Sequence, residues 1–309
     1  MHDTGKIYIA GSRGFLGTHL KKLLLENGYD VFTENSKLLH KPAHCLDFIK
    51  FICPNTVINL AGVVGGIGKN KHFPATMFYQ NLMISTNLLH ASYMGGVKKY
   101  VGMTCGCAYP DGIMVPMREE ILWEGLPEEN VTPFAIAKKS NIIMAQAYRK
   151  QHSFNAVSII GGNAYGEHDY FDAEHAHVIP SIMLKVRKAM AKNSHTLQLW
   201  GSGEPVRDFI YAKDMAEGIM RVMLDYDKPE PLNVASGDDI TIRELAELIC
   251  DIAGFEGIID WDTSKPEGQK VKTFSTYNME KELNWKPTTS LKEGLKNTWE
   301  WYCENMSVD

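Results

Sequence analysis

Three features are scarce in this chain of 309 residues. No apolar run approaches the roughly 18 residues that a membrane helix needs, so we expect no membrane partner. The six cysteines are scattered, which is sparse for a disulfide framework and typical of a reduced cytoplasm. Basic residues are not in excess: the formal net charge is −5, and we expect no nucleic-acid partner. Residues 1–4 do not resemble a signal peptide, which adds to the expectation of a cytoplasmic protein.

The composition is that of a globular protein. Hydrophobic residues make up 44% and charged residues 22% of the chain. Its length suffices for one large domain or two modest ones.

A glycine-rich turn near the start of the chain is its strongest local signal. Residues 6–9 are apolar and predict a buried strand, and residues 18–28 carry a leucine stripe that predicts a helix. A strand, a glycine turn and a helix in this order form a dinucleotide site, where backbone N–H groups meet a pyrophosphate. We therefore expect the turn to bind a cofactor through Gly11, Ser12, Arg13, Gly14, Phe15, Leu16 and Gly17.

The end of the second predicted strand, Asp30–Thr33, bears on the choice between NAD and NADP. Glu34 lies 20 residues after Gly14, where an acidic side chain binds the adenosine ribose and favours NAD. Arg13 and Lys37 could instead pair with a 2′-phosphate. We favour NADP, with NAD as the alternative.

Strands alternate with helices at a spacing of about 30 residues. This pattern predicts an α/β fold with a doubly wound parallel sheet. We expect further strands at 56–62, 99–104, 156–160 and 197–200. We expect helices at 73–93, 242–253 and 291–302, and Thr241 is the expected cap of the helix that begins at 242.

Several motifs give the chain a resemblance to the GDP-L-fucose synthase family, extended short-chain dehydrogenases. The motifs lie in the same order over nearly the whole chain: residues 65–67, 79–84, 107–110, 135–138, 146–148, 163–166, 177–180, 200–203, 241–247 and 264–268. The resemblance implies a substrate of the GDP-4-keto-6-deoxymannose type, epimerised at C3 and C5 and then reduced at C4 with NADPH. It also implies a homodimer formed through helices near 73–93 and 134–150.

The resemblance assigns the epimerisation to Cys107 and His177. A 4-keto group acidifies the neighbouring C–H bonds, so a base on one face and an acid on the other can invert a centre through an enolate. Cysteine and histidine both titrate near neutrality in suitable surroundings.

The reduction machinery departs from the family pattern. Short-chain dehydrogenases protonate the ketone oxygen from the tyrosine of Tyr-x-x-x-Lys, beside a serine or threonine. Here Phe134 occupies the tyrosine position and Cys105 the serine position, while Lys138 is retained. Three interpretations stay open: an epimerase without efficient reduction, a reductase that takes its proton from water, Thr104 or Cys105, and a deliberate Tyr-to-Phe variant.

The resemblance also assigns binding residues. Ala61, Gly62, Lys138, Asn163 and His177 are expected beside the cofactor. The residues expected at the sugar nucleotide are Asn163, Lys185, Trp200, Arg207, Lys265 and Lys272.

We expect two parts in the fold. A Rossmann domain comprises residues 1–165 and about 207–236, and a nucleotide-sugar-binding domain comprises about 166–206 and 237–309. Cys105-x-Cys107 and His175-x-His177 could together hold zinc, but we expect no metal. Two functional alternatives remain: an epimerase of another GDP-hexose or heptose with tightly bound NAD, and a non-catalytic nucleotide- or sugar-binding subunit.

Overall fold

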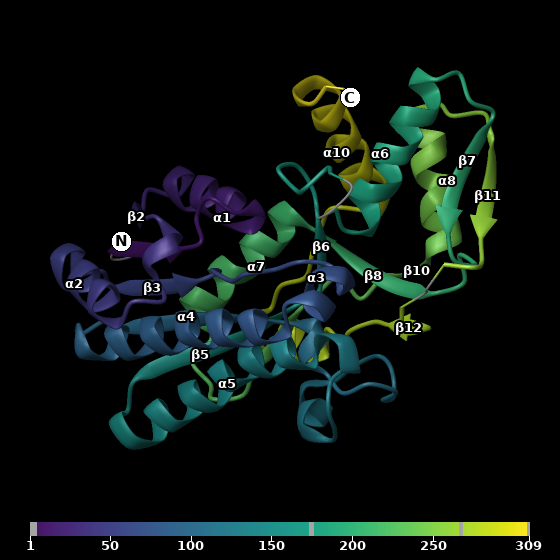
Figure 1. The fold of residues 1–309 in the computed structure, drawn as a ribbon. Helices are drawn as coiled ribbons and strands as arrows, with labels where there is room; N and C mark the ends of the chain where they lie inside the picture. The colour runs from purple at the N-terminus through teal and green to yellow at the C-terminus, as the bar shows by residue number, and fades with distance from the viewer. Residues whose placement is uncertain (1–4, 173–175, 266–267, 308–309) are drawn as a thin grey trace.

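The structure, a computed structural model, describes residues 5–172, 176–265 and 268–307. Its centre is a six-stranded parallel sheet with the order β2-β1-β3-β4-β5-β9 (Figure 1). These strands are β1 (Lys6–Ala10), β2 (Asp30–Thr33), β3 (Thr56–Asn59), β4 (Lys99–Cys105), β5 (Asn155–Gly161) and β9 (Leu232–Val234). The predicted α/β fold with a doubly wound parallel sheet is confirmed.

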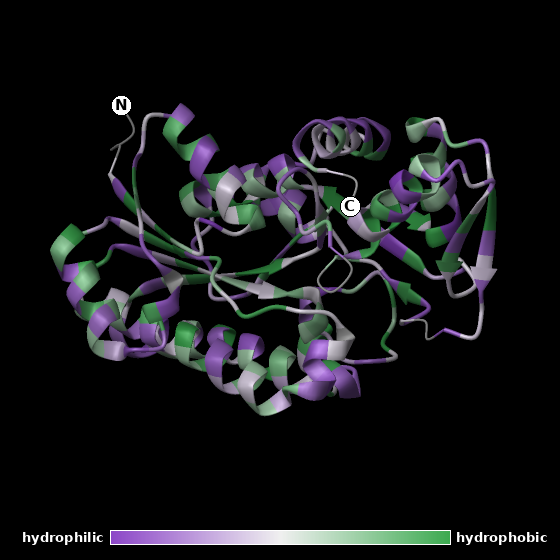
Figure 2. Ribbon diagram, turned by 45° about the horizontal axis from the view of Figure 1, so that its top comes forward, coloured by the Kyte–Doolittle hydropathy of each residue, from purple (hydrophilic) through white to green (hydrophobic). Residues whose placement is uncertain are grey.

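Helices cover both faces of this sheet (Figure 1). One face carries α2 (Pro42–Ile52), α4 (Pro74–Met94) and α5 (Thr132–His152). The other carries α1 (Phe15–Glu26), α7 (Ala212–Asp225) and α9 (Tyr277–Leu283). The strands are largely hydrophobic and the helices mix both kinds of residue, as Figure 2 shows, because the strands are buried on both sides and each helix has one face in solvent.

A smaller lobe packs at one end of the sheet. It contains two further sheets, β10-β8-β12 with β6 paired to β8, and β11 paired to β7. Its strands are β6 (Asn163–Tyr165), β7 (Thr196–Trp200), β8 (Val206–Tyr211), β10 (Asp239–Thr241), β11 (Ile258–Asp262) and β12 (Val271–Lys272). Its helices are α6 (Val178–Ala191), α8 (Ile242–Ala253) and α10 (Leu291–Asn305), which share one hydrophobic core.

Short helical segments complete the chain. They are α3 (Ile67–His72), η1 (Ser36–Leu38), η2 (Gly106–Ala108), η3 (Glu119–Trp123) and η4 (Glu129–Val131). The predicted cap at Thr241 is confirmed, because its side chain accepts a hydrogen bond from the backbone of Glu244 in a capping box. No helix in the described ranges has the length and apolar character to cross a bilayer.

The strand order reverses between β1 and β3, and the glycine turn lies at this point. Gly11 follows β1 and Ala61 follows β3, and a Cβ on Gly11 would lie 2.8 Å from the backbone nitrogen of Ala61. In parallel α/β sheets, ligands bind in the crevice outside the carboxyl ends of the strands where the order reverses.

One packing contact differs from the predicted division into two parts. Met279 and Leu283 of α9 are buried in the core beneath α1 and α7, although the sequence interpretation placed residues 237–309 in the substrate part. The expectation missed this because α9 is short and its apolar residues pair with distant segments. His175 of the suggested zinc motif lies outside the described residues.

Candidate active site

The glycine turn presents unpaired backbone donors at the start of α1. Gly11 has φ +86°, and Gly14 donates its N–H to the Gly11 carbonyl at 3.0 Å. A Cβ on Gly17 would lie 2.2 Å from the Gly11 oxygen, so only glycine lets the helix approach the turn this closely. No side chain caps α1 at Gly14, and its first turn holds no acidic residue. The helix N-terminus is therefore open to an anion.

The side chains of the glycine turn have different surroundings: some are buried and one is exposed. Ser12 is buried, and its hydroxyl finds no hydrogen-bond partner among the described residues, so it is suited to bind a phosphate oxygen. Leu16 packs into the core of the sheet, and the Phe15 ring lies against His19 with centroids 5.8 Å apart. Arg13 is exposed at the rim. The turn fits a dinucleotide cofactor, with backbone N–H groups as its main donors.

Glu34 lies at the end of β2, but its carboxylate is engaged within the protein. One oxygen accepts the hydroxyl hydrogen of Tyr8 and the other contacts His44, and the side chain is only 6% exposed. Burial, and next the Glu34 carboxylate, raise the pKa of Tyr8 above its ordinary value. The buried Tyr8 hydroxyl needs a hydrogen-bond acceptor and therefore competes with ribose hydroxyls for the Glu34 carboxylate.

Phe134 and Lys138 lie four residues apart on one face of α5. The Lys138 ammonium donates to the Ala61 carbonyl at 3.4 Å, and a Cβ on Gly62 would lie 3.6 Å from that ammonium. Burial lowers the pKa of Lys138. Phe134 is buried and offers no polar atom.

The two site cysteines lie two positions apart, Cys105 at the end of β4 and Cys107 in η2. The Cys105 thiol hydrogen-bonds to Cys107, and Lys272 of β12 donates to the Cys107 sulfur at 3.5 Å. The hydrogen bond from Cys105 and then the Lys272 ammonium hold the pKa of Cys107 well below its ordinary value. The same hydrogen bond, with burial, holds the pKa of Cys105 well above it. These surroundings favour the thiolate at Cys107 and the thiol at Cys105.

His177 lies just before α6 and belongs to the same cluster. Its Nδ1 is 3.5 Å from Oδ1 of Asp169, whose side chain is 1% exposed, while the imidazole itself is 62% exposed. Hydrogen bonding to Asp169 raises the pKa of His177, and the charge of Cys107 adds to the effect. Asp169 was missed from sequence because a lone acidic residue in a polar loop carries no spacing signal.

Arg207 and Asn163 lie on the paired strands β8 and β6. Arg207 stands opposite Lys272 in the register of β8 and β12, and its pKa is lowered by burial although the charge of Cys107 opposes this. The Asn163 amide donates to the backbone oxygen of Asp208 at 2.9 Å. Asp208 is fully buried, and burial raises its pKa to about 7.

Trp200 lies in the smaller lobe beside two other residues that we expect to bind the sugar nucleotide. Trp200 is 60% exposed, and the ammonium groups of Lys185 and Lys265 lie 5.2 Å and 5.8 Å from its ring centroid. An exposed aromatic face beside two cations suits a nucleobase with its phosphates.

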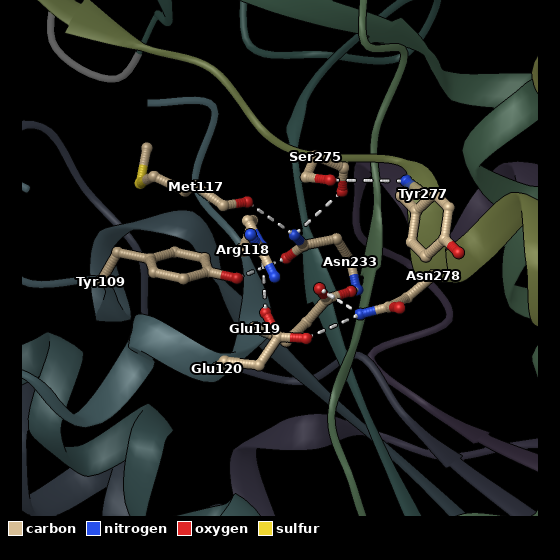
Figure 3. Close-up of polar contacts among 9 residues, drawn as sticks. All are labelled: Tyr109, Met117, Arg118, Glu119, Glu120, Asn233, Ser275, Tyr277 and Asn278. Carbon is tan, nitrogen blue, oxygen red and sulfur yellow. Dashed lines mark hydrogen bonds and ion pairs between the residues drawn. The ribbon is translucent and has the colours of Figure 1, made fainter. Parts of the chain in front are cut away.

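A buried polar network fixes the segment that follows Cys107 (Figure 3). The Tyr109 hydroxyl donates to the Asn233 side chain at 2.8 Å, and the Asn233 amide donates to the carbonyls of Met117 and Ser275 at 3.0 Å and 3.1 Å. Glu119 accepts from the Asn233 backbone at 2.9 Å. The network joins the segment carrying Cys107 to the segment carrying Lys272, and no motif or spacing predicts it.

The comparisons with known proteins agree with this geometry. Residues 7–235 match the model of the NAD dependent epimerase/dehydratase family. A putative GDP-L-fucose synthase 2 from Arabidopsis thaliana is 38% identical over 309 residues, covering 99% of this chain and 94% of the relative.

Two solved structures have nearly the same fold. A GDP-L-fucose synthetase from Naegleria fowleri bound to NADP aligns with a TM-score of 0.91 and 29% identity, over 99% of this chain and 94% of the other. A GDP-mannoheptose C4 reductase from Campylobacter jejuni with NADP bound aligns with a TM-score of 0.90 and 28% identity, over 98% of this chain and 99% of the other. The chain thus belongs to the NAD dependent epimerase/dehydratase family and is an enzyme of its GDP-L-fucose synthase-like, extended short-chain dehydrogenase branch.

Proposed function

We propose that this enzyme epimerises a GDP-linked 4-keto-6-deoxy sugar at C3 and C5, and that its C4 reduction is weak. The observation that carries the proposal is the contact of the Cys107 sulfur with the Lys272 ammonium, in a cluster that also holds His177 and Asp169. The cluster provides a base and an acid of different chemistry, near enough for their charges to interact.

The shifted pKa values give each group its role. The lowered pKa of Cys107 favours the thiolate, which accepts a proton from the carbon beside the ketone. The raised pKa of His177 favours the imidazolium, which delivers a proton to the opposite face. The enolate between these steps carries negative charge, which the Lys272 ammonium and the Arg207 guanidinium stabilise.

The crevice residues fit NADP. The backbone of residues 11–17 and the Ser12 hydroxyl would hold the diphosphate, and Arg13 with Lys37 would meet the 2′-phosphate. Lys138, Ala61, Gly62, Asn163 and His177 would lie at the nicotinamide end. When bound, NADPH supplies the hydride for the C4 ketone. NAD is the alternative, and it is disfavoured by the inward contacts of Glu34 with Tyr8 and His44.

The proton for that ketone has no evident donor in the described chain. Phe134 has no hydroxyl. The Thr104 hydroxyl donates to the Lys138 carbonyl at 3.2 Å, and the Cys105 thiol is hydrogen-bonded to Cys107. The Thr104 hydroxyl and the Cys105 thiol, which could replace the tyrosine as proton donors, are thus both engaged in hydrogen bonds to other acceptors. Water is then the proton source that remains, and this favours an epimerase without efficient reduction.

The remaining binding residues suit a nucleoside diphosphate sugar. Arg207 and Lys185 would contact the diphosphate, Trp200 and Lys265 the guanosine, and Asn163 with Lys272 the sugar. Two copies of the chain would pair through α4 and α5, where Tyr79 and Ile143 are exposed hydrophobic residues. The cytoplasmic location stays an expectation from sequence.

Solvent exchange tests the proposed function. Purified enzyme is incubated in D₂O with a GDP-4-keto-6-deoxymannose-type substrate, and NMR follows the protons at C3 and C5. The expected result is deuterium at both positions, and its loss in Cys107→Ser. Absence of exchange in a protein that binds the substrate would instead identify a non-catalytic binding subunit.

A GDP-heptose run in parallel distinguishes the sugar. Faster exchange with the heptose would assign the enzyme to that substrate and contradict the 6-deoxyhexose. Tightly bound NAD in the purified protein would contradict NADP.

A further inference from the structure

The turn Cys105-Gly106-Cys107 places two cysteines one residue apart, Cys105 at the end of β4 and Cys107 in η2. Both cysteines are partly exposed, and the thiol of Cys105 hydrogen-bonds to Cys107. Gly106 holds the turn in place, since a Cβ there would lie 2.2 Å from the Phe274 ring. The family resemblance places a serine at position 105. The thiol of Cys105 is therefore a departure from the family pattern, and the expected epimerisation does not require it.

The two sulfurs have the complementary states that oxidation chemistry needs. Lys272, 3.5 Å from the Cys107 sulfur, favours its thiolate, and the thiolate is the form that attacks an oxidant. Cys105 remains a thiol within reach. A reactive cysteine beside a resolving cysteine is the usual arrangement of a reversible redox site.

We propose that Cys105 and Cys107 form a reversible oxidation site that reacts with hydroperoxides. The Cys107 thiolate attacks the terminal oxygen of the hydroperoxide, the O–O bond breaks, and the released alkoxide or hydroxide takes a proton to leave as alcohol or water. The Cys107 sulfenic acid is then attacked by the Cys105 sulfur. A disulfide forms and one water molecule leaves. The two thiols lose two electrons in all, and the hydroperoxide gains them.

The disulfide protects the base from irreversible oxidation. Without a resolving thiol, a sulfenic acid is oxidised further to the sulfinic acid, which ordinary thiols do not reduce. A disulfide across three residues closes a small ring, and strained disulfides are more easily reduced. Epimerisation therefore stops under peroxide and returns once a dithiol is present.

Trypsin isolates both cysteines in a single peptide, Tyr100–Arg118, which has no other cysteine and no internal lysine or arginine. The full-length protein is treated with hydrogen peroxide, quenched with an alkylating agent, digested and measured by mass spectrometry. The expected product is this peptide lighter by two hydrogen atoms and not alkylated, restored by dithiothreitol. Fragment spectra separate it from oxidation of the three methionines in the peptide.

Cys105→Ser is the matched control, because it restores the hydroxyl expected in the family and removes only the resolving sulfur. Sulfinic acid at Cys107 should accumulate at least about tenfold faster in this variant than in the wild type. Cys105→Ala also removes the hydrogen bond to Cys107, so the sulfinic acid is expressed there as a fraction of all oxidised Cys107. This fraction should again exceed that of the wild type, which covers the case in which one variant fails to fold.

Two results would overturn the proposal. One is equal accumulation of sulfinic acid in the wild type and both variants. The other is a wild-type peptide that stays fully alkylatable while the exposed Cys53 and Cys303 become oxidised. The masses need no sugar nucleotide, so this outcome is independent of the epimerase assignment.

Discussion

The charges around Cys107 determine what the site can do. A cysteine alone would be protonated at neutral pH, and a histidine alone would be mostly neutral. Lys272 and the Cys105 hydrogen bond favour the thiolate, and Asp169 favours the imidazolium. Each shift thereby favours the form that a base and an acid need.

Lys272→Met should make the Cys107 thiol less acidic. The lost ammonium stabilised the thiolate at 3.5 Å, so alkylation of Cys107 at neutral pH should slow by about tenfold and recover at higher pH. The measurement is the pH dependence of iodoacetamide labelling at peptide 100–118. Lys272→Arg keeps the positive charge and should stay near the wild type, and an unshifted profile in Lys272→Met would refute the role of Lys272.

Asp169→Asn should lower the pKa of His177. In the wild type the raised pKa keeps the imidazolium present to higher pH, and it is lost as the pH rises through that value. In the variant this loss should occur about 1–2 pH units lower, so the alkaline limb of the deuterium-exchange profile moves down. A purely structural role for Asp169 would instead lower exchange equally at every pH.

Phe134→Tyr should raise the rate of NADPH oxidation with the 4-keto sugar by about 10²–10⁴-fold, because it restores a positioned proton donor on α5. Stopped-flow absorbance of NADPH measures this. Phe134→Leu, which changes the packing without adding a hydroxyl, should leave reduction as slow as before. If Phe134→Tyr also stays slow, the missing hydroxyl does not limit the reaction.

At the scale of elements, the site depends on segments far apart in the sequence. Asn233 of β9 ties the stretch after Cys107 to the stretch after Lys272 through its side chain (Figure 3). Met117 also donates its N–H to the Thr273 carbonyl at 2.8 Å. These bonds fix the relative positions of the thiolate and its ammonium.

Asn233→Ala should therefore destabilise the fold and weaken the base together. The Tyr109 hydroxyl and the carbonyls of Met117 and Ser275 lose a buried partner, at a cost of at least about 2 kcal/mol of unfolding free energy. Urea unfolding measures this. Asn278→Ala removes a partly exposed amide from the same network and should cost less than about 1 kcal/mol. Equal losses in the two variants would count against the network.

The spacing of residues along the sequence predicted the helices, strands and turns better than it predicted the contacts within the candidate site. The glycine turn, the alternating strands and helices and the Thr241 cap are encoded within a few residues each, and the structure has them. Asp169, Asn233 and the inward turn of Glu34 depend on contacts with residues 8 to 124 positions away, which the spacing rules for helices, strands and turns do not cover. The position of α9 was missed for the same reason.

At the scale of the whole molecule, two chemistries normally share one crevice in this fold. In the proposed function, the glycine turn at the reversal of the sheet serves the cofactor, and the smaller lobe brings Arg207, Lys272 and His177 to the sugar. The proposed acid and base, His177 and Cys107, are both present, while Phe134 stands where the family resemblance places the tyrosine. We therefore expect epimerisation to be much faster than reduction of the C4 ketone.

The ratio of deuterium entering C3 and C5 to NADPH oxidised, measured in one sample of wild-type enzyme in D₂O, tests this account most directly. We predict that solvent exchange outruns NADPH oxidation by about a hundredfold or more, because the acid and base are in place and the proton relay is missing. One deuteron at each centre for every NADPH consumed would contradict it, since epimerisation and reduction would then proceed at the same rate.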